Sequence, residues 1–181
     1  MKKIMWAAVA LTLFAVTSRA QDVPKADVAV GYSYLHFNGS GGASGINNNG
    51  LSGSVAFNAT SVLGIVADFG FYHGSVSGVG INSESYTFGP RFSMRRSDKF
   101  TPFVQALFGG GHLNSITVGG VTVPSVNAFA YSFGGGTDIG IAKGGKIALR
   151  PQFDYIGLRN NGSTTNTERF GVGIVFNIGQ K

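Results

Sequence analysis

The segment from Arg169 to Phe176, near the end of the chain, most constrains what this sequence can fold into. Its even-numbered positions are Phe, Val, Ile and Phe, whereas its odd-numbered positions are Arg, Gly, Gly and Val. Because successive side chains of a β-strand point to opposite faces, one face of this strand would be apolar and the other mostly polar or small. A strand needs such an outer face when it closes a β-barrel inside a lipid bilayer. The segment therefore predicts a membrane-spanning β-barrel.

The N-terminus has the pattern of a secretory signal peptide. Two lysines follow the first methionine and precede an apolar run that ends at Val16, and small residues lead to a cleavage site between Ala20 and Gln21. The apolar run is shorter than the roughly 20 residues that a spanning helix needs. We therefore expect residues 1–20 to be a cleaved signal peptide and residues 21–181 to form one barrel domain. A retained N-terminal anchor is the alternative.

The absence of cysteine and the distribution of charge limit the kinds of function that this chain could have. The chain has no cysteine, so it has neither a disulfide framework nor a lipid-modified N-terminal cysteine. Loss of the signal peptide would lower the formal net charge from +6 to +3, because three of the 14 basic residues precede position 21. The remaining basic residues are scattered and form no patch, so we expect no nucleic-acid partner.

Segments of period-two alternation, separated by clusters of Gly, Ser and Asn, fill the chain after the signal. They predict an all-β fold, an eight-stranded antiparallel up-and-down transmembrane β-barrel. The expected strands cover residues 26–37, 50–58, 63–74, 83–95, 101–113, 126–141, 146–158 and 166–178. Short connections alternate with longer ones, including those around residues 74–82 and 159–165, which places the short turns and both ends of the chain on the periplasmic side.

The faces of these strands differ in chemistry. Aromatic and aliphatic side chains share one parity, which would face lipid, and charged side chains share the other. The inward parity carries six charged residues, namely Asp68, Arg91, Arg95, Asp138, Arg150 and Asp154. We interpret them as a charge network in the lumen, because an eight-stranded barrel is just wide enough for side chains to fill it and unpaired buried charges are costly. A soluble, lipocalin-like barrel, with aromatics inside and charges outside, is the alternative.

Together these features resemble the small eight-stranded outer-membrane β-barrels, such as the transmembrane domain of outer-membrane protein A and related porin-like, opacity-type barrels of Gram-negative bacteria. The resemblance covers the whole chain after the signal. It implies a location in the bacterial outer membrane, contact with outer-membrane lipid and lipopolysaccharide, and insertion by the barrel-insertion machinery. It also implies a C-terminal assembly signal, whose positions are filled here by Arg169, Gly171, Ile174 and Phe176. We expect a monomer without a cofactor.

The expected function is a structural or surface role, with no chemistry of its own. One alternative is a small passive pore, in which the charge pairs of the lumen rearrange to pass ions. Another is an acyl hydrolase, because Ser75, His73 and Glu84 could meet at the outer edge of one hairpin, and acyl transfer requires a serine activated by a histidine that a carboxylate orients. The His-x-Ser run is similar to that of the outer-membrane lipid A deacylases, although Val76 stands where that family has Asn.

Three histidines fall at the outer ends of three different strands. By parity, His36, His73 and His112 all point outward, so they cannot easily converge on one ion. Their spacing matches no zinc motif. We expect them to anchor the barrel at the membrane interface, and we expect no metal site.

Overall fold

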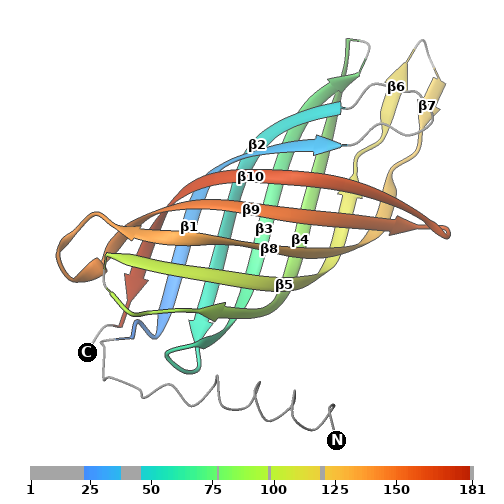
Figure 1. The fold of residues 1–181 in the computed structure, drawn as a ribbon. Helices are drawn as coiled ribbons and strands as arrows, with labels where there is room; N and C mark the ends of the chain where they lie inside the picture. The colour runs from blue at the N-terminus through green and yellow to red at the C-terminus, as the bar shows by residue number, and fades with distance from the viewer. Residues whose placement is uncertain (1–22, 38–45, 77, 98, 119–120, 180–181) are drawn as a thin grey trace, which may run out of the picture.

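The computed structural model describes residues 23–37, 46–76, 78–97, 99–118 and 121–179. The expected signal peptide and its cleavage residues, Ala20 and Gln21, lie outside these ranges. The described chain forms a closed antiparallel barrel of eight strands (Figure 1), which confirms the expected fold class. It contains no helix that is long and apolar enough to cross a membrane.

The eight barrel strands follow one another around the barrel in chain order, and each pairs antiparallel with its neighbours. They are β1 (Ala26–Phe37), β2 (Ile46–Asn58), β3 (Leu63–Val76), β4 (Val79–Ser93), β5 (Phe100–Leu113), β8 (Val126–Gly140), β9 (Ile147–Asn160) and β10 (Ser163–Ile178). The first strand pairs with the last along its whole length, from Ala26 opposite Ile178 to Phe37 opposite Thr167, and this pairing closes the barrel.

Two short elements interrupt the series. Between β5 and β8, β6 (Ile116–Val118) and β7 (Val121–Val123) form a separate hairpin that projects beyond the end of the barrel (Figure 1). Between β8 and β9, the 3-10 turn η1 (Lys143–Gly145) makes a tight connection at the opposite end. The hairpin was not expected from the sequence. Each of the eight barrel strands overlaps an expected strand, with ends that differ from the expected ones by up to four residues.

The outer surface of the barrel is apolar along the middle of the strands. Val30, Phe69, Phe88, Phe133 and Val172, on five different strands, are between 47% and 65% exposed. Side chains of the opposite parity are buried in the lumen, and they include the charged ones. This is the reverse of a soluble barrel, so the lipocalin-like alternative is wrong.

Two connections at the outer end are shorter than the sequence predicts. The segments around residues 74–82 and 159–165 are mostly strand, because β3 and β4 continue to a turn at Gly78 and β9 and β10 continue to a turn at Asn161 and Gly162. All three turn residues have positive φ, at 80°, 46° and 81° respectively. A two-residue turn with positive φ matches the twist of a hairpin, so the chain reverses tightly here.

Candidate functional site

The candidate site is the set of charged side chains inside the barrel. In the part of the chain that the structure describes, this set has four acidic and four basic members, so their formal charges cancel. The acids are Asp27, Asp68, Asp138 and Asp154, and the bases are Arg91, Arg95, Arg150 and Arg169. All except Asp138 and Arg95 are at most 5% exposed. Alternation places them there, because each strand residue lies at an inward position of its strand.

The first cluster joins β1, β4, β8 and β9. Arg150 binds Asp138 in a fork, with Nε to Oδ1 at 2.6 Å and Nη2 to Oδ2 at 2.8 Å. Its Nη2 also donates to Oδ1 of Asp27 at 3.0 Å, and the same carboxylate oxygen accepts from Nη1 of Arg91 at 3.2 Å. Asp27 therefore lies between two arginines, so neither guanidinium is left in the lumen without a counter-charge.

The second cluster joins β3, β9 and β10 around one arginine. Nη1 of Arg169 lies 2.6 Å from Oδ1 of Asp68, and its Nη2 lies 2.9 Å from Oδ2 of Asp154. The same guanidinium donates to the hydroxyl of Tyr72 at 3.2 Å. This cluster reverses the first, because here one arginine lies between two aspartates.

A glutamine of β5 connects the two clusters. Gln105 accepts a hydrogen bond from Nε of Arg91 at 3.2 Å and donates one to Oδ1 of Asp154 at 3.1 Å. Beside it, the ring of Phe103 lies 4.5 Å from Cζ of Arg91 and 4.9 Å from Cζ of Arg150, within the range of cation–π attraction. The clusters thus form one network that crosses the lumen between opposite walls.

Arg95 forms no ion pair with the network and is linked to it only through Asn58, whose Nδ2 donates to Oδ2 of Asp27 at 3.4 Å. It follows the last residue of β4 and reaches the neighbouring turn, where it donates to the carbonyl of Ser61 at 3.0 Å and to Oδ1 of Asn58 at 2.8 Å. Burial lowers the pKa of its guanidinium, although the negative charges of Asp27 and Asp138 act to raise that pKa. Arg95 therefore lies at the edge of the network without an ion pair of its own among the described residues, since β4 ends two residues before it.

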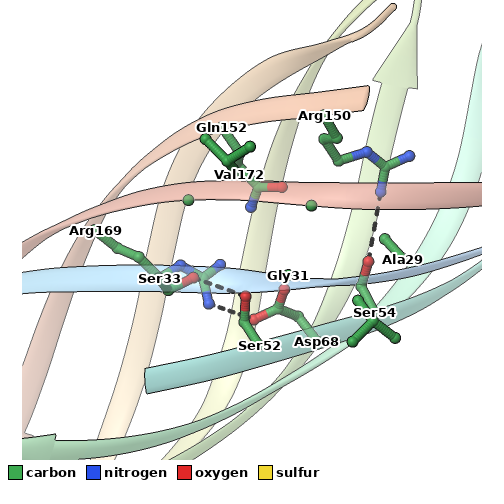
Figure 2. A pocket seen from close by; sticks show the side chains of 14 residues that line it. Ala29, Gly31, Ser33, Ser52, Ser54, Asp68, Arg150, Gln152, Arg169 and Val172 are labelled. Atoms are coloured by element: carbon green, nitrogen blue, oxygen red, sulfur yellow. Dashed lines mark hydrogen bonds and ion pairs between the residues drawn. The ribbon is translucent and has the colours of Figure 1, made fainter. Parts of the chain in front are cut away.

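Little free space remains where the clusters meet. A cavity of about 30 Å³ lies among Ser33, Ser52, Ser54 and Asp68. Figure 2 shows Arg150 and Arg169 beside these residues. The hydroxyls of Ser33 and Ser52 are joined by a hydrogen bond of 2.7 Å. A cavity of this size holds about one or two water molecules, so the side chains fill the lumen at this level.

The sequence identified most members of the network but not their pairing. Among the six expected members, which were assigned no specific partners, the structure forms one ion pair, between Arg150 and Asp138. Asp27 and Arg169 were missed as members, although each shares the inward parity of its strand, and that parity is the signal that could have found them. They contribute to four of the five ion pairs among the described residues.

The assembly-signal positions divide between the two faces of β10. Arg169 and Gly171 face the lumen, while Ile174 and Phe176 face outward and are 37% and 47% exposed. Their recognition by the insertion machinery stays a prediction.

The side chains of the hydrolase alternative do not come together. His73 Nδ1 is 2.7 Å from Oδ1 of Asn82, while Glu84 lies opposite Phe71 in the pairing of β3 with β4. Ser75 is exposed, and no hydrogen bond joins it to His73 in the described structure. The carboxylate therefore does not orient the imidazole, as a triad requires.

All three histidines make the same contact at the outer end of the barrel. Nδ1 of His36, His73 and His112 lies 2.7 Å from the side-chain oxygen of an asparagine directly across the hairpin, which is Asn47, Asn82 and Asn127 respectively. An amide oxygen only accepts, so Nδ1 is the donor in each pair. Among the described residues, no three His, Asp or Glu side chains are placed to hold a metal ion.

A closed barrel of eight strands, apolar outside and charged inside, has the fold of the small outer-membrane β-barrel proteins. Neisserial surface protein A (NspA) is similar with a TM-score of 0.70 at 11% identity, covering 85% of this chain and 97% of that chain. Ail, the attachment invasion locus protein of Yersinia pestis, is similar with a TM-score of 0.61 at 15% identity, covering 85% and 99%. The N-terminal β-barrel domain of Pseudomonas aeruginosa OprF follows at 0.54 and 14%, covering 84% and 98%. No protein-family model and no curated protein matches the sequence.

Proposed function

We propose that this protein is an integral outer-membrane protein of a bacterium, with a structural or surface role and a lumen closed by ion pairs. The observation that carries the proposal is the network of Arg91, Arg150 and Arg169 with four aspartates, which leaves only about 30 Å³ between its two clusters. In this role the barrel presents its outer ends to the surroundings and carries out no reaction. Lipopolysaccharide and outer-membrane lipid are the proposed contacts of the wall, the insertion machinery is the proposed assembly partner, and the protein is a monomer.

The exposed apolar surface supports the membrane part of this proposal. Side chains such as Ile65, Phe88 and Phe153 are 43% to 65% exposed, and they surround the barrel rather than gather on one side. Burial of such a surface in lipid recovers its hydrophobic free energy, whereas in water it would drive association. The strand ladder is closed, so no backbone edge is left unpaired in hydrocarbon.

The ion pairs support a closed lumen over a passive pore. A pore needs a continuous aqueous path, whereas Asp27 of β1 is joined to Arg150 of β9 at 3.0 Å and to Arg91 of β4, three strands away around the barrel, at 3.2 Å. Moving one guanidinium away would leave aspartates buried without a partner, at a cost of about 3–5 kcal/mol. Rearrangement that passes ions is therefore disfavoured.

Conductance tests this proposal. Residues 21–181 would be refolded in detergent, checked for folding by a heat-dependent gel shift and added to a planar bilayer. We expect no current steps from the wild-type barrel and steps from Arg150→Ala, because this change removes the arginine that joins Asp27 to Asp138. Arg159→Ala, at an exposed outward position of the same strand, is the matched control and should give no steps. Regular steps from the folded wild type would instead support the pore.

A further inference from the structure

We infer that the outer half of the lumen is a binding site for a small, uncharged, largely apolar molecule. A cavity of about 330 Å³ lies inside the barrel on the outer side of the ion-pair network, and all eight barrel strands contribute to its lining. The inference concerns a different compartment of the lumen from the network, and it stands whether or not the network conducts.

The walls of this cavity are apolar, contrary to the rest of the lumen. Leu35, Ile81, Ile156 and Leu158 all occupy inward positions at the outer ends of their strands and line it. If this space served only to pass water and ions, inward positions would be polar. The inward-facing side chains thus change along the strands, from charged ones at the ion-pair network to aliphatic ones near the outer end.

The size of the cavity argues against an incidental packing defect. Protein interiors contain few voids larger than a water molecule. This cavity is partly open, and its volume is about twice that of an enclosed apolar cavity of about 150 Å³ that binds benzene. Ligand pockets have volumes of about 300–1,000 Å³. The space therefore suits a molecule of roughly two aromatic rings.

Two polar groups in the lining also lack partners. Oδ1 of Asn48 and Oγ of Ser83 are buried and make no hydrogen bond in the described structure, and both residues line the cavity. A buried acceptor without a partner is costly, and a hydroxyl on the ligand would supply a donor. At the inner end, Tyr72 lines the cavity and binds Arg169, so the ion-pair network forms the floor. One carboxylate, that of the exposed Glu84, also lines the cavity, and the deeper lining is formed by uncharged side chains such as Leu35 and Ile156.

Methyl NMR tests the site without relying on activity. The barrel would be placed in lipid nanodiscs with ¹³C-labelled isoleucine and leucine methyls, and 2-naphthol would be the probe. We expect saturable shifts at Ile81, Ile156 and Leu158, which line the cavity. Ile65 and Ile174 face outward and report partitioning of the probe into lipid, so their shifts should not saturate.

Two cavity-filling variants make the test specific. Ala128→Trp places a large ring in the cavity, and Thr165→Trp places one near its outer side, where an exposed residue tolerates substitution. Each should abolish the saturable shifts, while Ala67→Trp on the outward face of β3 should keep them. If Ala128→Trp fails to fold, Thr165→Trp tests whether filling the cavity abolishes the saturable shifts. Absence of saturation at Ile156 in the wild type, or saturation that persists in a folded cavity-filling variant, would overturn the inference.

Discussion

At the scale of single residues, two side chains of opposite charge organise the lumen in the same way. Asp27 accepts from Arg91 and Arg150, and Arg169 binds Asp68 and Asp154. Each is a central charge between two opposite charges, so its removal leaves two buried groups without their partner. Loss of one member of a buried ion pair costs about 3–5 kcal/mol, far more than loss of an exposed pair.

Substitution of Arg169 by Met tests this difference. We expect the free energy of unfolding to fall by about 3–5 kcal/mol, because Asp68 and Asp154 lose their shared counter-charge. The measurement is urea unfolding of the barrel in lipid vesicles, followed by circular dichroism and gel mobility. Arg159→Met, at an exposed position of β9, should change the value by less than about 0.5 kcal/mol. Equal effects of the two substitutions would contradict the role given to the network.

At the scale of elements, the seam between β1 and β10 depends on glycine. Gly31 lies opposite Gly173, and a Cβ added at Gly31 would meet the backbone carbonyl of Val172 and the Cα of Gly173. Backbone atoms cannot move aside as the end of a side chain can. The first and last strands therefore approach closely here because neither residue has a side chain.

Gly31→Ala should weaken the closing seam. We expect a loss of about 1–3 kcal/mol in the free energy of unfolding, since the added methyl group forces a backbone shift. Gly53→Ala is the matched control, because its Cβ would meet only the carbonyl of Ala29, at 3.4 Å, which is an ordinary contact. Amide hydrogen exchange should rise first along β1 and β10 in Gly31→Ala. Unchanged exchange there would show that the seam tolerates the methyl group.

The sequence predicts the elements better than it predicts their ends and pairings. Period-two alternation identifies each barrel strand because the apolar and polar faces differ so strongly. The outer ends of β3, β4, β9 and β10 are rich in Gly, Ser, Asn and Thr, so their composition resembles that of loops although the ladder continues. The ion pairs are harder to predict than the strand ends, because they join strands that are distant in the sequence. Asp27 of β1 and Arg150 of β9 form one such pair. Such partners depend on the stagger of the strands, which a single sequence does not show.

At the scale of the whole molecule, the barrel has an apolar middle and a polar outer end. The outward histidines pair with asparagines at the end where the β6–β7 hairpin projects. Aromatic side chains such as Phe69 and Phe153 lie below that level and are exposed. We therefore expect the outer membrane interface to lie near the His–Asn pairs, with the hairpin in water.

Spin labels can measure this placement, since the chain has no cysteine to compete. A label at Val172→Cys, which is 54% exposed in the middle of β10, should be relaxed by oxygen dissolved in lipid and not by a water-soluble nickel chelate. A label at Thr122→Cys, which is exposed in β7, should show the opposite preference. Accessibility of Val172→Cys to the chelate would contradict the membrane position proposed for the strands.

The pairing of β1 with β10 also bears on how the chain can be delivered to the membrane. Until the first strand meets the last, the inner face of the sheet is open, and Asp27, Arg150 and Arg169 would face whatever surrounds it. A single charge placed in hydrocarbon costs about 2.5–3.5 kcal/mol on insertion scales. An open sheet carrying several such charges could not diffuse through lipid unaided. We therefore predict that the chain enters the membrane with its charged face shielded until its two end strands join.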